Sequence, residues 1–305
     1  MHRSSVLARA AKASIAFRSA VCPGVAGILL CANAAGAAAP ISLANHRAVY
    51  DLSLAESSGT RAVESARGRI VIDFTGDACK GYTMQTRQVT VLESGETGSR
   101  TSDLRNTTFE SGDGRSYRFK TSTVLNGTPG QSVDGTAEAA PDLLKVKLKE
   151  PKRDQFQDTG EILFPTVHMR RLIQAARDGL STVSVKVFDG SDDGRKVYDT
   201  LAVIGRQAPV PGSSPAPGSS PASGDKGGDR DKPLRDGAMA ALPRWPVTLS
   251  YYIPGQGERT PIYVLSFDLY ENGVSGALRL NYGEFAVVGD LTRLETMPTA
   301  SDCQP

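Results

Sequence analysis

Apolar and polar residues alternate along much of the chain. Between Leu144 and Lys149 every second residue is apolar and each residue between them is a lysine. The same alternation recurs over 70–74, 183–187, 247–253 and 263–269. A period of two places one face of a strand against a core and the other in solvent. The pattern predicts many half-buried strands and therefore an antiparallel, all-β protein with few helices.

Short turn sequences separate these segments. Asn272-Gly273 lies between two alternating stretches, and this dipeptide is the strongest short hairpin signal in a sequence. Asn126-Gly127 and the glycine-containing stretches 112–114 and 282–284 mark further reversals. Strands joined by short turns form a meander. Because an open sheet of about ten or more strands rarely stays flat, we expect this one to curl into an open spiral or a barrel-like sheet.

One segment has helical spacing instead. Its apolar positions are Met169, Leu172, Ile173 and Ala176. Pro165 suits the first turn of a helix and Gly179 suits its C-terminal end. We expect this helix to pack in the hollow or at one end of the curled sheet. Its arginines, Arg170, Arg171 and Arg177, are interpreted as a solvated basic face rather than a ligand site.

Residues 206–243 have a different composition. Proline, glycine and serine dominate the first part, and a charged, glycine-rich run follows. Such a segment cannot bury a core and is typical of a flexible insertion. A long loop within one sheet has the same signature as a linker between domains. We therefore predict a single domain over 40–305 that contains this insertion.

The first 39 residues have the pattern of an export signal. They contain four basic residues and no acidic one, and the apolar run 20–35 is followed by an alanine-rich stretch. This pattern predicts a cleavable signal peptide, residues 1–39, and a periplasmic location. Pro23 and Gly24 interrupt the apolar run, which is shorter than the roughly 20 residues of a spanning helix. A permanent membrane anchor is the weaker interpretation.

Cleavage would lower the formal charge from +2 to −2 and would leave two cysteines, Cys79 and Cys303. Two cysteines in an exported chain most simply form one disulfide. Two unrelated thiols are the alternative. The near-neutral charge and the 22% of charged residues do not indicate a nucleic-acid-binding protein.

Few residues suggest catalysis. The predicted mature chain has two histidines: we expect His46 near the surface before the first strand, and His168 in a capping or packing role. No nucleophile-elbow sequence precedes a helix. Residues 189–194 imitate the start of a calcium loop, but Thr200 stands where that loop needs an acid. We predict no enzymatic activity, no cofactor and no metal.

Several stretches together resemble the EipB family of cell-envelope integrity proteins. The resemblance runs from about residue 43 to the C-terminus, without the insertion. The stretches that carry it are 46–54, 76–82, 107–110, 163–169, 188–191, 245–247, 261–263 and 269–275.

This resemblance implies an α-proteobacterial periplasmic protein, with antiparallel strands wound in an open spiral around a helix. It also implies a disulfide between Cys79 and Cys303 and a role in envelope integrity without an assigned catalytic activity. The first hypothesis is a factor that binds another envelope component, either a protein or a lipid. The second is a lipid or lipoprotein carrier that uses the hollow of the sheet. An envelope hydrolase would need a preorganised nucleophile, which the sequence does not offer.

Overall fold

The computed structural model describes residues 40–58, 63–96, 98–209, 230–255 and 260–298. The predicted signal peptide, residues 1–39, and Cys303 lie outside these ranges. Cleavage of the signal and the pairing of Cys79 with Cys303 therefore stay predictions.

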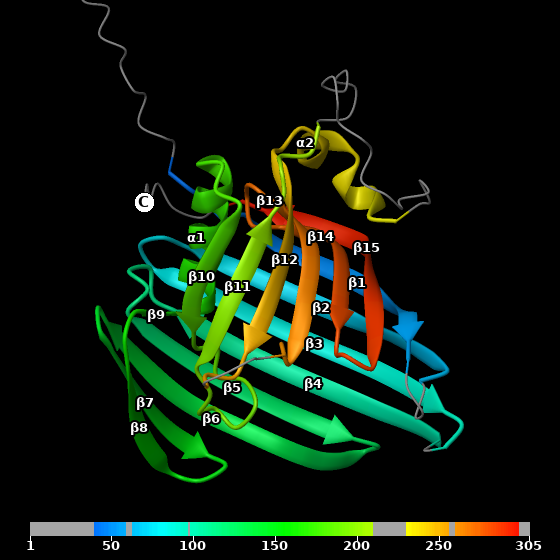
Figure 1. Ribbon diagram of the computed structural model, residues 1–305, viewed down its shortest axis with the longest axis horizontal. Helices are drawn as coiled ribbons and strands as arrows, with labels where there is room; N and C mark the ends of the chain where they lie inside the picture. Colours follow the sequence, from blue (N-terminus) through cyan, green and yellow to red (C-terminus); the bar gives the residue numbers. More distant parts are fainter. Residues whose placement is uncertain (1–39, 59–62, 97, 210–229, 256–259, 299–305) are drawn as a thin grey trace, which may run out of the picture. The chain divides into compact units, whose positions relative to one another are not determined.

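The described residues form a 15-stranded sheet with a helix against its inner side (Figure 1). The strands are β1 (Asn45–Ser57), β2 (Ser65–Asp77), β3 (Gly81–Ser94), β4 (Gly98–Glu110), β5 (Ser116–Leu125), β6 (Thr128–Ala140), β7 (Leu143–Glu150), β8 (Asp154–Thr159), β9 (Ile162–Leu163), β10 (Thr182–Val187), β11 (Tyr198–Ile204), β12 (Arg244–Tyr252), β13 (Tyr263–Tyr270), β14 (Ser275–Asn281) and β15 (Phe285–Met297).

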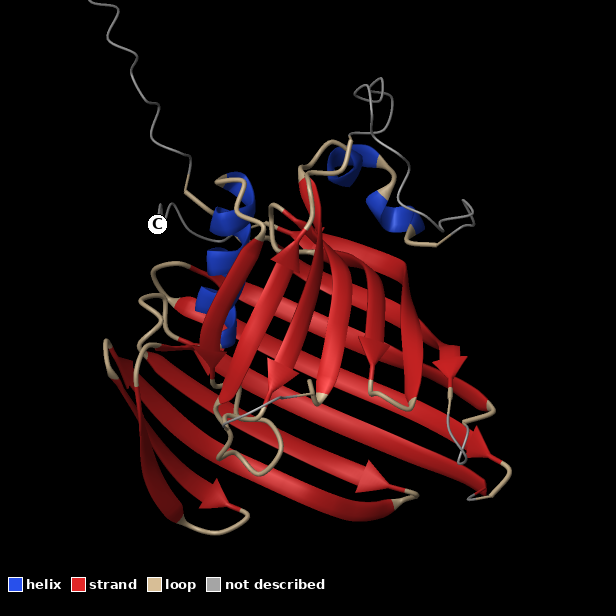
Figure 2. Ribbon diagram, in the orientation of Figure 1, coloured by secondary structure: helices blue, strands red, loops and turns tan. Residues whose placement is uncertain are grey.

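The order of the strands in the sheet follows the chain. From one edge to the other it is β8 to β1 and then β15 to β9, so β1 and β15 pair in the middle of the sheet. The two edge strands, β8 and β9, are consecutive in sequence. Every pair is antiparallel except β9 with β10, which a helix connects. The predicted meander and its curled, barrel-like form are confirmed (Figure 2).

The predicted turns have the expected backbone. Asn126 and Gly127 both have positive φ, 50° and 80°, as a two-residue hairpin turn between β5 and β6 requires. Gly273 has φ +84°, and its N–H donates to the carbonyl of Tyr270 at 2.8 Å. Short turns of this kind set the register of neighbouring strands, so alternate residues of each strand face the same side.

The predicted helix is confirmed as α1 (Pro165–Arg177). Pro165 occupies its first turn. Gly179, with φ +72°, donates its N–H to the carbonyl of Ala176 and ends the helix. The buried residues Leu172 and Ile173 share a core with Trp245 and other inward-facing residues of β11, β12 and β13. Burial of this apolar stripe holds the helix on the sheet.

The predicted solvated face of α1 is wrong for two of its three arginines. The Arg177 side chain is only 17% exposed and pairs with Glu271 at 2.9 Å. Arg170 donates to the Tyr82 hydroxyl at 2.8 Å, and its guanidinium lies 5.1 Å from the centre of that ring. Only Arg171 is exposed. Strand β3 and the turn between β13 and β14 therefore cover the side of the helix that would otherwise face solvent.

The flexible insertion predicted over residues 206–243 includes residues that are folded in the structure. Residues 210–229 lie outside the described ranges, but the residues after them form η1 (Lys232–Leu234) and α2 (Gly237–Ala240). Leu234 and Met239 are buried in a core shared with Tyr50 and Leu291. The low average hydrophobicity of 206–243 conceals these apolar positions near its end.

Candidate functional site

A cavity of about 160 Å³ lies on the inner side of the sheet, beside the first turn of α1. The four strands β1 to β4 form one side of it, and the turn between β13 and β14 forms another. Its lining residues are Leu43, His46, Tyr50, Ile72, Phe74, Met84, Thr108, Glu110, Pro165, Thr166, Met169, Asn272, Gly273 and Ser275.

Most of this lining is apolar. Ile72, Phe74, Met84 and Met169 are partly exposed, so solvent reaches the cavity. Seven of the fourteen lining residues have polar side chains, but apolar atoms form most of the lining surface, and the one carboxyl group belongs to Glu110. A mostly apolar cavity with polar groups at particular positions is typical of a ligand-binding site.

Glu110 caps helix α1 from strand β4. Its Oε2 accepts the backbone N–H of Thr166 at 2.7 Å, and its Oε1 accepts that of Val167 at 2.9 Å. The first N–H groups of a helix have no partner within the helix, so a side chain from elsewhere must satisfy them. Burial raises the pKa of the Glu110 carboxyl, and the two backbone donors oppose this shift. The contact fixes the helix to the strand that lines the cavity.

His46 is buried, against the expectation that it lies near the surface. It belongs to β1 rather than preceding the first strand, and its side chain faces inward. Its Nδ1 lies 2.7 Å from the carbonyl of Ala44, and its ring is 5.8 Å from that of Phe74. Burial lowers the pKa of His46. A neutral imidazole therefore adds to the mostly apolar lining.

His168 lies on the buried side of α1, as expected for a packing role, and is not among the lining residues. It is 4% exposed, and burial lowers the pKa of its imidazole to about 4. Within the described part of the chain, its Nε2 has no hydrogen-bond partner.

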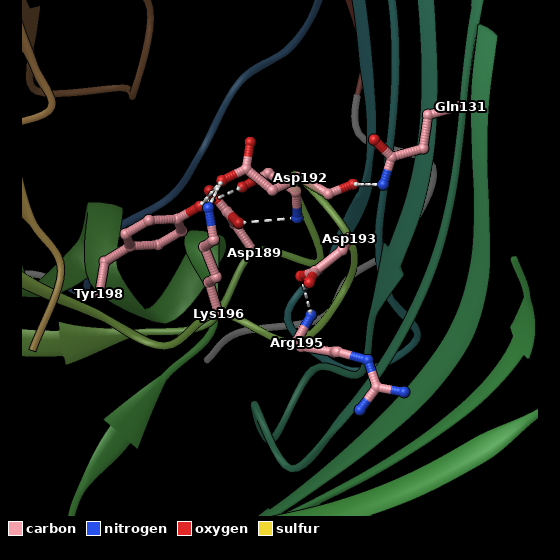
Figure 3. Close-up of polar contacts among 8 residues, drawn as sticks. Gln131, Asp189, Asp192, Asp193, Arg195, Lys196 and Tyr198 are labelled. Atoms are coloured by element: carbon pink, nitrogen blue, oxygen red, sulfur yellow. Dashed lines mark hydrogen bonds and ion pairs between the residues drawn. The ribbon is translucent and has the colours of Figure 1, made fainter. Parts of the chain in front are cut away.

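A second polar cluster occupies the loop between β10 and β11 (Figure 3). The Asp192 carboxylate accepts from Lys196 and Tyr198, each at 2.8 Å, and Gln131 of β6 donates to the Asp192 carbonyl at 2.9 Å. A Cβ added to Gly190 would lie 2.4 Å from the Phe119 ring. The loop therefore packs tightly on the inner face of β5 and β6.

The aspartates of this loop serve its own hydrogen bonds. Across the ranges that the structure describes, no group of three or more His, Cys, Asp or Glu is arranged to hold a metal ion. In the same ranges, no helix is both long enough and apolar enough to span a membrane.

Cys79 lies in the turn between β2 and β3 and is exposed. Its backbone N–H donates to the Asp77 carboxylate at 2.9 Å. This contact fixes the backbone of the turn at the rim of the sheet.

The fold places the chain among β-barrel-like proteins. The crystal structure of a β-barrel-like protein of a domain of unknown function from Brucella abortus matches it with a TM-score of 0.73 and 32% identity. The match covers 85% of this chain and 100% of the other.

The sequence comparisons give the family. The EipB-like family model matches residues 37–298. The cell envelope integrity protein EipB of Brucella abortus (strain 2308) is 34% identical over 272 residues, which are 89% of this chain and 90% of the relative. This chain belongs to the EipB-like family, and the resemblance inferred from its short motifs is confirmed.

Sequence reasoning did not find the cavity. Its lining comes from five strands, a helix and a turn, and no local pattern connects these segments. Glu110 lies within one of the stretches that resemble the family, but its role depends on a helix that begins much later in the chain. The burial of Glu110 is visible only in the structure, so no local sequence signal indicated its capping role.

Proposed function

We propose that this protein is a non-enzymatic periplasmic factor that maintains the cell envelope by binding an apolar group of another envelope component. The cavity beside α1 is the observation that carries this proposal. Membership of the EipB-like family supports the envelope role. The Glu110 carboxylate uses both oxygens to cap the helix, which favours a binding site over a hydrolytic one.

The size of the cavity favours a partner's side chain over a whole lipid. Its volume of about 160 Å³ is close to the roughly 150 Å³ of an engineered apolar cavity that accepts benzene. Sites for drug-sized ligands measure about 300–1,000 Å³. One large apolar side chain, or the end of an acyl chain, fills the space available here.

A lipid or lipoprotein carrier is the second candidate. Met84 and Met169 both line the cavity. Methionine side chains are unbranched and re-pack easily around different ligands. Rearrangement of these two side chains would enlarge the cavity toward the volume that an acyl chain requires.

Two adjacent residues of β2 provide a matched test. Ile72 lines the cavity, and Val71 occupies the alternate position on the opposite face of the strand. Ile72→Trp should fill the cavity, abolish crosslinking from a photoreactive residue at position 169, and remove protection of cells against envelope stress. Val71→Trp should preserve both properties. Melting temperatures would establish that both variants fold.

Equal activity of the two variants would contradict binding in this cavity. Native mass spectrometry of the purified protein separates the two candidates. A partner-binding protein should carry no lipid, whereas a carrier should retain lipid that Ile72→Trp displaces.

The location is tested separately. Intact-mass analysis of the exported protein should show a mature N-terminus between Ala37 and Pro40, where the small residues end. A mass that retains residues 1–35 would contradict a soluble periplasmic protein. Thiol labelling under denaturation, before and after reduction, should reveal Cys79 and Cys303 only after reduction.

A further inference from the structure

The outer face of β5, β6 and β7 is basic. It carries five exposed basic side chains against three acidic ones. The basic residues are Arg118, Lys120, Lys145, Lys147 and Lys149, and the acidic residues are Asp134, Glu138 and Glu150. Lysine and arginine exceed aspartate and glutamate by only two in the whole chain, so positive charge is concentrated here. We call these three strands' outer side the basic face.

A groove of about 340 Å³ crosses the basic face. Its lining includes Thr107 and Thr136, together with Arg118, Lys120 and Lys149. Thr136 lies opposite both Arg118 and Lys147 in the strand register, so hydroxyl and cationic donors stand side by side. Hydroxyl, ammonium and guanidinium groups donate the hydrogen bonds that phosphate oxygens accept.

The positive charges of the groove are only partly neutralised. Lys120 and Lys149 share one carboxylate, that of Asp134, at 3.9 Å and 3.4 Å. The Arg118 guanidinium lies 4.5 Å from the centre of the Phe109 ring, and no carboxylate in the described part of the chain forms an ion pair with it. A cation over an aromatic face keeps its full charge while its position is held.

We propose that the basic face binds the phosphate groups of anionic lipids at a membrane surface. Its cations are spread over three strands, which are about 4.8 Å apart, so they form an array rather than a single anion pocket. A protein partner would need apolar or aromatic anchors at the centre of its interface. The outward positions at the middle of these strands are lysine, arginine, serine, threonine and acids, and the apolar ones, Val124, Ala140 and Leu143, lie at the strand ends.

The tip of the same hairpin supports a membrane as the occupant. Val124, near the end of β5, shares the face of Lys120 and is 36% exposed, and Leu125 beside it, at the alternate position, is 52% exposed. Apolar side chains next to a basic surface are typical of proteins that lie on anionic membranes. The proposal rests on the proposed location in the envelope, but not on ligand binding in the cavity.

Vesicle flotation with the full mature protein tests the proposal. The protein should bind vesicles of phosphatidylcholine with phosphatidylglycerol, should not bind phosphatidylcholine alone, and should be released as salt is raised. Arg118→Gln/Lys147→Gln/Lys149→Gln removes three charges from the basic face. Each basic residue near an anionic surface contributes roughly fivefold in affinity, so the triple variant should bind on the order of 100-fold more weakly.

A second triple variant, Lys80→Gln/Arg206→Gln/Lys232→Gln, is the matched control. It removes the same charge from exposed positions outside β5, β6 and β7 and should bind within a few-fold of wild type. Equal losses in both variants, or equal binding to both kinds of vesicle, would overturn the proposal. Binding of inorganic phosphate to the groove without binding to vesicles would also overturn it. Crosslinking through the cavity is expected to survive in the basic-face variant, so the two proposals fail separately.

Discussion

On strands β5 to β7, adjacent residues have opposite surroundings. Tyr117 and Phe119 face inward, are each 2% exposed, and stack with ring centres 5.7 Å apart. Arg118 lies between them in sequence and faces solvent. The buried inner side chains stabilise the fold. A change of charge at an outer position such as Arg118 removes little buried surface. We therefore predict that substitutions at inward positions of a strand change stability, whereas substitutions at outward positions of the same strand change binding to a surface.

The largest effect is expected from Phe188→Ala. The Phe188 ring is fully buried and contacts the rings of Tyr117, Phe119, Phe156 and Phe164. Its truncation should lower the free energy of unfolding by about 3–5 kcal/mol in urea denaturation. Phe109→Ala, on the outer face beneath Arg118, should cost about 1 kcal/mol. Similar losses for the two variants would remove the distinction between the faces.

The next largest effect concerns His168 and pH. The pKa of its imidazole falls from 6.5 in the unfolded chain to about 4 in the folded protein. Above pH 6.5 both states are neutral. As pH falls from about 6.5 to about 4, only the unfolded state takes up the proton, so the folded state should lose about 3 kcal/mol of stability.

His168→Gln should flatten this part of the pH profile, measured as the free energy of unfolding between pH 7 and pH 4. His46→Gln is the control among the described histidines, and it should leave most of the dependence in place. An unchanged profile in His168→Gln would show that His168 is solvated in the folded protein.

A smaller effect is expected from Glu110→Gln. The amide cannot accept both helix N–H groups, so stability at pH 7 should fall by about 1–2 kcal/mol. Because burial raises the pKa of the Glu110 carboxyl, the folded state holds its proton more tightly than the unfolded state does. Wild type should therefore gain stability from Glu110 as pH falls through the raised pKa, and the variant should lose this gain.

Asp103, on the outer face of the same strand, is the matched control for Glu110. Hydrogen bonds from Arg87 lower the pKa of its carboxyl. Its contribution has the opposite sign, because it weakens as pH falls through the lowered pKa. Asp103→Asn should therefore reduce the loss of stability in acid. A pH dependence of the same sign in both variants would contradict the assignment of Glu110 as a buried cap.

The smallest effect on stability is expected from Arg118→Ala. The side chain is exposed and its one described contact is the Phe109 ring, so the free energy of unfolding should change by less than about 1 kcal/mol. Affinity for anionic vesicles should nevertheless fall measurably. A large loss of stability would mean that this arginine supports the sheet.

Local patterns predicted the strands, the hairpin turns and helix α1, because each depends on residues close in sequence. The alternation over Leu144–Lys149 and the positions of Pro165 and Gly179 were sufficient for these elements. The burial of Arg177 was not predictable in the same way, because helical spacing identifies an apolar face but not what covers the opposite one. The expected surface position of His46 was wrong for a similar reason, because its burial depends on the pairing of β1 with both β2 and β15.

The pairing of β1 with β15 has a consequence for biosynthesis. Asn45 pairs with Met297. One edge of β1, the first strand to be synthesised, therefore has no partner until β15, the last strand, has been synthesised. Contacts between the two ends of a chain form slowly, and an open strand edge is prone to wrong pairing. Until β15 is synthesised, the nascent protein therefore has an incomplete sheet in which one edge of β1 is unpaired. A chain truncated before β15 would keep this edge of β1 unpaired and could form intermolecular strand pairs with other incompletely folded chains.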